Sequence, residues 1–116
     1  MATVRFIITG SVKDGQVAAF RDLASRMSTS VKDGEPDTTT YNWFISEDGS
    51  FINEDEYASS DALGAHLGNA TASGLLDEYM GLAEISAVHV LGDVDDAAKG
   101  ILEAFGAVHY SKTHSI

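Results

Sequence analysis

The segments of this chain that favour β-strands carry apolar side chains at both odd and even positions. Side chains alternate between the two faces of a strand, so these segments predict a sheet that is apolar on both faces. The predicted strands lie over residues 3–11, 38–47, 50–58 and 85–91, with a short closing strand over residues 107–112. The fold must therefore cover two apolar surfaces.

Apolar residues at helical spacing separate these strands. The predicted helices lie over residues 16–32, 60–67, 75–80 and 93–105. Gly34 and Pro36 end the first helix, Ser59 or Ser60 caps the second, and small residues (68–73) link the second to the third. The resulting order is β-α-β-β-α-α-β-α-β.

This order predicts a ferredoxin-like α+β fold, the split βαβ arrangement, with an antiparallel sheet and its main helices on one face. We expect one domain over residues 1–116, with a loose tail at residues 113–116. Helices on one face leave the other apolar face bare, so a homodimer that packs two such faces together is expected. The alternative is that the last helix and the tail wrap over that face.

The pair Asp48-Gly49 predicts a tight two-residue turn between the second and third strands. With that turn Glu47 lies opposite Ser50. Phe44 would then face Asn53, Asn42 would face Asp55, Trp43 would face Glu54 and Tyr41 would face Glu56. Asn42, Asn53, Asp55 and Tyr57 would share one face, either as the wall of a pocket or at a wet edge of the sheet.

Composition narrows the possible partners. Asp and Glu outnumber Lys and Arg by 18 to 7, giving a net charge of -11 that disfavours nucleic acids and anionic membranes. There are no cysteines, which excludes disulfides, thiolate catalysis and cysteine-based metal sites. No His, Asp or Glu spacing indicates a metal site. We expect a cytoplasmic protein, because neither a signal peptide nor a membrane span is evident in the sequence.

Two stretches carry a family likeness. The first is Asp55–Leu67 (DEYASSDALGAHL). The third strand ends there with an acidic residue, one intervening residue and an aromatic residue, and a helix that contains Ala and His follows. The second stretch comprises LGDV at residues 91–94 and FGAVHY at residues 105–110. The chain resembles the antibiotic biosynthesis monooxygenase family, whose longer members are similar in the second stretch. The resemblance implies a dimeric α+β barrel.

The same resemblance implies a cofactor-independent monooxygenase that acts on a small phenol, quinol or polyketide-like substrate, with no metal or cofactor. His66 is the candidate general base, because an imidazole titrates near neutral pH. Asp55 would orient that imidazole. The candidate substrate-binding residues are Asn42, Phe44, Asn53, Tyr57 and Tyr79. The alternative interpretation makes His66 a structural residue that bonds the end of the third strand.

Two other functions stay open. A non-catalytic dimer can bind a small ligand in the same pocket, and other members of the barrel type are isomerases or haem-binding proteins. Haem-degrading members of this family have an Asn on the first strand. This chain departs from that pattern with Arg5, Ile7 and Thr9, and its one tryptophan, Trp43, lies on the second strand.

Overall fold

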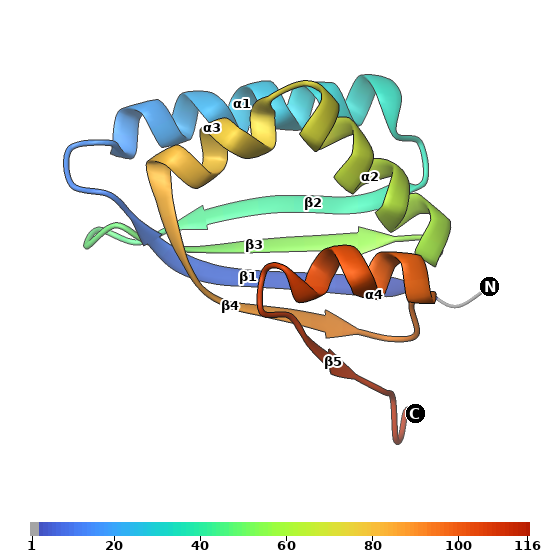
Figure 1. The fold of residues 1–116 in the computed structure, drawn as a ribbon. Coiled ribbons are helices and arrows are strands. Elements are labelled where there is room, and N and C mark those ends of the chain that lie inside the picture. Colours follow the sequence, from blue (N-terminus) through green and yellow to red (C-terminus); the bar gives the residue numbers. More distant parts are fainter. Residues whose placement is uncertain (1–2) are drawn as a thin grey trace.

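The computed structural model describes residues 3–116 and places five strands in one sheet with four helices on one of its faces (Figure 1). The elements are β1 (Val4–Val12), α1 (Val17–Gly34), β2 (Thr38–Ile45), β3 (Ser50–Tyr57), α2 (Ser60–Ala72), α3 (Leu75–Leu82), β4 (Ala83–Leu91), α4 (Asp96–Glu103) and β5 (Val108–Tyr110). The strand order is β2-β3-β1-β4-β5. All neighbours are antiparallel except β4 and β5, which are parallel. The ferredoxin-like α+β prediction is confirmed, with a mixed sheet.

Side chains cap two of the helices, and α4 begins at Asp96, three residues later than predicted. Ser59 caps α2, because its hydroxyl accepts a hydrogen bond from the Ala62 backbone N–H at 3.2 Å. Asp95 caps α4 in the same way, through the Ala98 N–H at 2.8 Å. The buried stripe of α1 consists of Phe20, Leu23, Met27 and Val31. These residues recur every three or four positions, so α1 lays one apolar face on the sheet.

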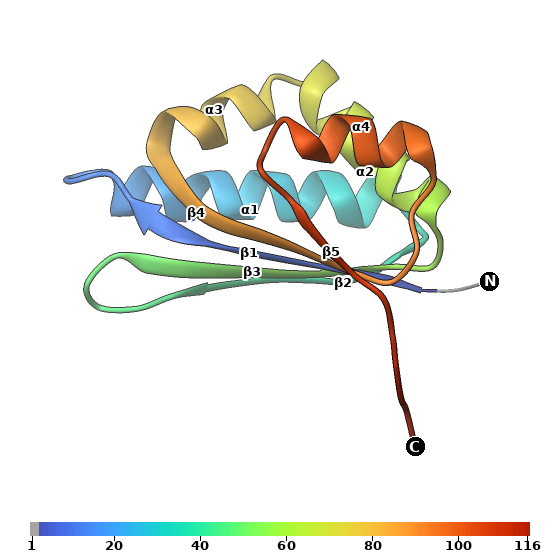
Figure 2. The same ribbon diagram turned by 60° about the horizontal axis from the view of Figure 1, so that its bottom comes forward.

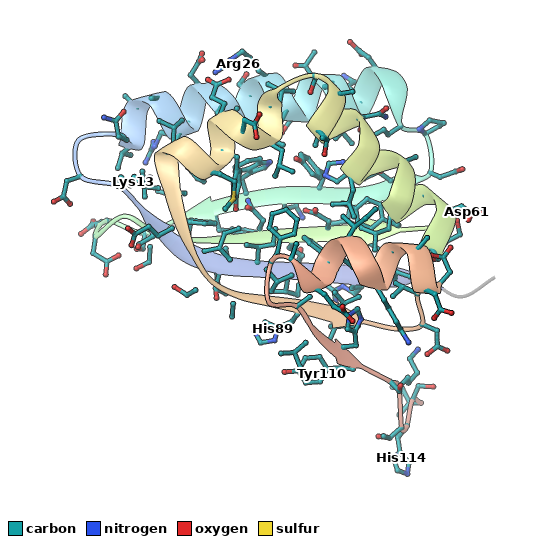
Figure 3. The ribbon with its side chains drawn as sticks, in the orientation of Figure 1. Lys13, Arg26, Asp61, His89, Tyr110 and His114 are labelled. Carbon is teal, nitrogen blue, oxygen red and sulfur yellow. The ribbon has the colours of Figure 1, made fainter. Side chains whose placement is uncertain are left out.

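The predicted link over residues 68–73 is wrong, because α2 continues as a helix to Ala72. The turn into α3 occurs at Gly74, whose φ of +79° lies in the left-handed region that glycine adopts without strain. Helix α3 packs beside α1, where Arg26 donates to Glu78 Oε2 at 2.8 Å (Figures 1 and 3). This glycine therefore lets the chain change direction between α2 and α3.

The loop of the β2–β3 hairpin is one residue longer than predicted. Ser46 pairs with Ser50 through a 2.8 Å backbone hydrogen bond, and three residues lie between them. Gly49 has a φ of +87°, and Asp48 Oδ1 accepts from the Ser50 N–H at 2.9 Å. This is the three-residue hairpin that ends on a left-handed glycine.

That extra residue shifts the register by one and reverses the faces of β2. The observed pairs are Ile45 with Phe51, Phe44 with Ile52, Trp43 with Asn53, Asn42 with Glu54, and Tyr41 with Asp55. The predicted pairs of Phe44 with Asn53 and of Asn42 with Asp55 are therefore wrong. Tyr41 and Trp43 face the helices, and Asn42 and Phe44 face away from them.

A second irregularity changes the face of one residue in β4. The β1–β4 register shifts between Thr9 and Gly10, so that Thr9 pairs with Ala87 and Gly10 with Ile85. Ile85 consequently packs into the core with Val88, although strict alternation along the strand would put it on the same face as Leu91. A Cβ atom on Gly10 would lie 2.2 Å from the Glu84 carbonyl oxygen, so only glycine fits this close approach.

Among residues 3–116, no helix covers the other face of the sheet (Figure 2). Helix α4 lies on the same side as the other helices, and the chain after β5 runs away from the sheet (Figure 2). Neither element wraps over this face. We call it the open face. Its exposed apolar side chains include Phe44 (54% exposed), Ile52 (46%), Leu91, Val108 and Tyr110. Both faces of the sheet thus carry apolar side chains, as predicted, and on the open face they lie beside polar side chains such as Arg5, Asn42 and Glu54.

Candidate active site

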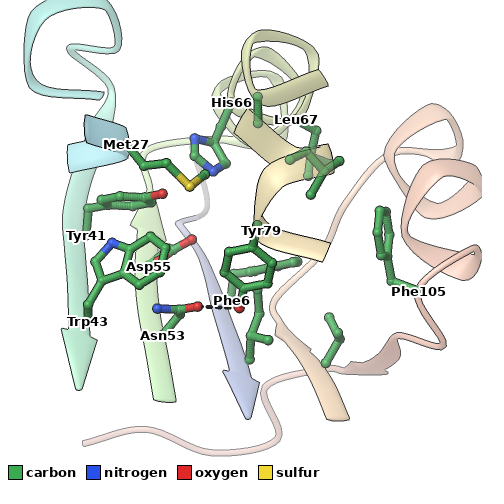
Figure 4. Close-up of a pocket in the computed structure, with 14 residues that line it drawn as sticks. Phe6, Met27, Tyr41, Trp43, Asn53, Asp55, His66, Leu67, Tyr79 and Phe105 are labelled. Atoms are coloured by element: carbon green, nitrogen blue, oxygen red, sulfur yellow. Dashed lines mark hydrogen bonds between the residues drawn. The ribbon is translucent and has the colours of Figure 1, made fainter. Parts of the chain in front are cut away.

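A pocket lies between the inner face of the sheet and the helices (Figure 4). Its apolar lining comprises Phe6, Ile8, Met27, Leu67, Ala70, Leu76, Val88 and Phe105, and its polar lining comprises Tyr41, Trp43, Asn53, Asp55, His66 and Tyr79. The free volume is about 50 Å³. An engineered cavity that holds benzene measures about 150 Å³. An aromatic ligand therefore requires the walls to move, and Phe105 stands across the pocket from Tyr41 and Trp43 (Figure 4).

His66 lies on α2 and points its ring into this pocket (Figure 4). Its Nδ1 is 2.8 Å from Oε1 of Glu35, the residue that follows α1, and both side chains are buried. Asp55 was expected to orient the imidazole, and Glu35 does so instead. Burial lowers the pKa of His66, and the Glu35 charge and hydrogen bond oppose that shift. A neutral imidazole with its Nδ1–H donated to Glu35 presents Nε2 as an acceptor.

Asp55 lies on β3 and is 3% exposed. Its Oδ2 accepts a hydrogen bond from the Tyr57 hydroxyl at 2.8 Å. Burial raises the pKa of Asp55 to about 7; the Tyr57 hydrogen bond opposes the shift, while the Glu35 and Glu54 charges add to it. Asp55 is therefore a carboxyl group that can exchange a proton near neutral pH.

Three polar atoms on the sheet side of the pocket have no hydrogen-bond partner within residues 3–116. They are Trp43 Nε1, Asn53 Nδ2 and Asp55 Oδ1, and each is buried. Asn53 uses its other side-chain atom, Oδ1, to accept from the Tyr79 hydroxyl at 2.6 Å (Figure 4). A buried polar atom without a partner costs about 1–3 kcal/mol. These two donors and one acceptor are therefore suited to a polar group of a ligand.

The structure brings together four of the predicted site residues and separates three from them. His66, Asp55, Asn53 and Tyr79 line the pocket. Tyr57 is buried and does not line the pocket, but its hydroxyl bonds Asp55 and its ring lies next to His66. Asn42 and Phe44 are exposed on the open face, so their predicted place in the pocket is wrong.

Sequence reasoning missed Tyr41, Trp43 and Glu35. The alternation of β2 groups the two aromatic residues correctly, and a three-residue loop would have placed them opposite Asp55 and Asn53. Glu35 sits between the helix-ending Gly34 and Pro36, in a stretch whose composition indicates only a turn. No sequence signal there points to a buried carboxylate.

The described part of the chain supports neither a metal site nor a membrane-spanning helix. Residues 3–116 hold no group of three or more His, Cys, Asp or Glu side chains placed to bind a metal ion. None of the helices in this range is both long enough and apolar enough to cross a membrane.

Known proteins share this fold at low sequence identity. No family model and no curated protein sequence matches the chain. MupZ from Pseudomonas fluorescens superposes with a TM-score of 0.85 at 17% identity, over 100% of this chain and 94% of that one. SnoaB from Streptomyces nogalater, described as a cofactor-independent oxygenase, gives 0.68 at 14% identity, over 82% of this chain and 96% of that one. A protein named antibiotic biosynthesis monooxygenase gives 0.65 at 17% identity, over 79% and 99%. The chain therefore has the fold of the antibiotic biosynthesis monooxygenases.

Proposed function

We propose that this protein is a cofactor-independent monooxygenase of a small phenol, quinol or polyketide-like molecule. The observation that carries the proposal is the buried imidazole of His66, which Glu35 holds at the wall of an apolar pocket. An apolar enclosure excludes water and favours a flat aromatic molecule, and a neutral imidazole can accept its proton. SnoaB, which shares the fold, is described as an oxygenase of this kind.

The proposed reaction starts when His66 removes a proton from a ring CH₂ or hydroxyl group of the substrate. For an anthrone-like CH₂, the anion gives one electron to O₂, and the two radicals combine in a carbon–oxygen bond. The peroxide takes up a proton and loses water, which leaves a carbonyl group. The carbon thus loses two hydrogen atoms and gains one oxygen atom, and the second oxygen atom leaves in water. The substrate supplies the electrons, so the reaction needs no flavin, haem or metal.

The sheet side of the pocket would position this substrate. Trp43 Nε1 and Asn53 Nδ2 are donors for a carbonyl or phenolate oxygen, and Asp55 Oδ1 is an acceptor for a hydroxyl group. Donors aimed at an oxygen that gains negative charge stabilise the anion more in a dry pocket than in water. Phe105 and Leu76, opposite the sheet, would have to shift to admit the ring.

We also propose that the working unit is a homodimer joined through the open face. Phe44, Ile52 and Leu91 expose apolar surface there, and the helices occupy the other side of the sheet. Exposed apolar side chains on an uncovered sheet face favour association, and a two-fold dimer buries them against a second copy of the same face.

Oxygen uptake with a panel of quinols and anthrones tests the proposed activity. We expect uptake by the wild-type protein and a loss of about 100-fold or more in His66→Ala, the range that a positioned general base contributes. His114→Ala is the matched control, because His114 lies in the exposed C-terminal tail. Uptake that His66→Ala leaves unchanged would refute the role of His66.

The second candidate is a ligand-binding dimer without catalysis. The unpartnered atoms of Trp43, Asn53 and Asp55 favour ligand binding whatever chemistry follows. Saturable quenching of Trp43 fluorescence by the same phenols, with no oxygen uptake on the whole panel, would support binding alone. A Soret band that grows on addition of haem would instead favour a haem-binding member of the barrel type.

A further inference from the structure

Glu35 lies between the pocket and the outside of the protein. Its side chain is buried, although Pro36 and Asp37, which follow it, are exposed. Its Oε1 contacts His66 Nδ1 at 2.8 Å and also accepts from the Thr38 hydroxyl at 3.3 Å. A carboxylate beside the candidate base is thus anchored at the start of β2, outside the pocket that the base faces.

Glu35 also lines two further cavities. One, of about 10 Å³, is shared with His66, Met27 and other residues of α1 and α2. The other, of about 90 Å³, is a surface depression between the end of α1 and the start of α2, lined also by Pro36 and Ala65. Glu35 therefore extends from this depression to the imidazole, and the imidazole extends from Glu35 to the pocket.

A proton taken from a substrate in this pocket needs a destination. If it stayed on His66, an imidazolium and a substrate anion would be two new charges in an apolar enclosure, which is costly. If the imidazole passes its Nδ1 proton to Glu35, the carboxylate becomes neutral as the substrate becomes negative. The number of buried charges then stays constant.

We infer that Glu35 is a proton relay that connects His66 with solvent, an inference that rests on the proposed function. The substrate gives its proton to Nε2 while Nδ1 gives its own to Glu35 Oε1, and Glu35 releases that proton to water in the surface depression. Protonation of the peroxide runs the same path in reverse. Only O–H and N–H bonds form and break, and no electron moves. Glu35 acts through His66 and does not touch the substrate.

The other titratable groups near His66 do not offer this path. The ring centroids of Tyr41 and Tyr57 lie 5.3 and 5.5 Å from the centroid of the His66 imidazole. Burial raises the pKa of both phenols. Asp55 lines the same pocket, and it is bonded to Tyr57 instead of the imidazole. Glu35 is the carboxylate that bonds His66 and also lines the surface depression.

Two substitutions separate a relay from a purely structural partner. Glu35→Gln keeps a carbonyl oxygen that can accept from His66 Nδ1–H, so the ring orientation stays while the relay is lost. Glu35→Ala removes both the bond and the relay, and it leaves a space beside the surface depression. Asp33→Asn is the matched control, an exposed acid near the end of α1 that lines none of these cavities.

Nitrogen NMR of the imidazole tests the relay without any substrate. We expect Glu35→Gln to keep the Nδ1–H tautomer while the exchange of that proton with water slows by about 10-fold or more, because the intervening acid is gone. Asp33→Asn should exchange like the wild type. Exchange as fast in Glu35→Gln as in the wild type would overturn the inference, whether or not any substrate is found.

Formate provides the second arm, measured as oxygen uptake on the anthrone panel. Formate fits the space left by Glu35→Ala and should restore both proton exchange and uptake there, but not in Glu35→Gln, where the side chain fills the site. The relay would be overturned if Glu35→Ala is folded, as judged by its thermal unfolding curve, and formate restores neither proton exchange nor oxygen uptake. Slowed exchange in Glu35→Gln together with no uptake by the wild type would refute the oxygenase and leave the relay standing.

Discussion

The β2–β3 hairpin carries polar side chains on both of its faces, and the two sets are bonded in different ways. On the open face, Glu54 accepts from Arg5 Nη2 at 2.9 Å and from Asn42 Nδ2 at 3.2 Å. Each of these three side chains thus has a partner from a neighbouring strand. These bonds join β1, β3 and β2 across the sheet. The Nε atom of Arg5, on β1, is nevertheless buried and bonds to nothing within residues 3–116.

On the helix face, one residue away along each strand, the bonding is incomplete. Trp43, Asn53 and Asp55 each keep a buried polar atom that bonds to nothing within residues 3–116. The same strands therefore hold cross-strand bonds to Glu54 on the open face and a set of donors and acceptors that point into a pocket on the helix face. The helix face of the hairpin thus presents unbonded polar atoms to a pocket, whereas Asn42 and Glu54 on the open face bond each other.

The largest expected difference between the faces is in stability. Phe51 is 2% exposed, and its ring centroid lies 5.0 Å from that of Phe20 and 5.9 Å from that of Tyr79. Phe51→Ala should lower the free energy of unfolding by about 3–5 kcal/mol, the usual cost of emptying a buried aromatic site. Ile52→Ala, its neighbour on the open face, should cost about 1 kcal/mol or less in dilute solution. Urea unfolding measures both, and equal losses would show that the two faces are packed alike.

The next effect is the pH dependence that Asp55 imposes on stability. Its pKa is about 7 in the folded protein, above the roughly 4 of an unfolded aspartate, so the folded state binds more protons between these values. Its contribution is complete below about pH 4 and is lost as the pH rises to about 7, by up to about 4 kcal/mol. Asp55→Asn cannot titrate, so the wild type should lose stability relative to this variant over that range. A constant difference between the two proteins from pH 4 to 8 would contradict a raised pKa.

The hairpin shows how far the sequence alone could go. Alternation along β2 and β3 identifies the residues that share a face of each strand, because side-chain period is a local property. Which face of β2 joins which face of β3 depends on the loop, and the difference between two and three residues reverses it. Asp48-Gly49 is compatible with both loops, so the sequence placed Asn42 and Phe44 in the pocket and left Tyr41 and Trp43 out.

The His66 site shows a different limit. The helix that carries His66 and its cap at Ser59 could be predicted, because capping and periodicity are local signals. Its partner Glu35 lies 31 residues earlier in the sequence and reaches the ring only once α1 and α2 have packed on the sheet. Contacts of this kind depend on tertiary packing, which a single sequence does not encode as a pattern.

The proposed dimer provides a third test of the difference between the two faces. Phe44 is 54% exposed at the open face. In a two-fold dimer through this face, Phe44→Glu would remove an apolar contact from each copy and bring two negative charges into one interface. We expect association to weaken about 30-fold or more, which corresponds to about 2 kcal/mol at an interface residue. Light scattering over a dilution series measures this. Glu47→Gln in the hairpin loop serves as the control, and a wild-type protein that is monomeric at micromolar concentration would refute the dimer.

The smallest effect concerns two asparagines that lie on adjacent strands and on opposite faces. Asn53→Ala removes the free Nδ2 donor from the pocket, so binding of 1,8-dihydroxyanthrone should weaken about 10-fold, the worth of one good hydrogen bond. Asn42→Ala removes only an exposed bond to Glu54, so binding should stay the same and stability should change by about 0.5 kcal/mol or less. Trp43 fluorescence reports binding in both variants. If both substitutions weakened ligand binding equally, the difference in hydrogen bonding between the two faces would not identify the binding face. Weaker binding in Asn53→Ala alone would place the ligand on the helix face.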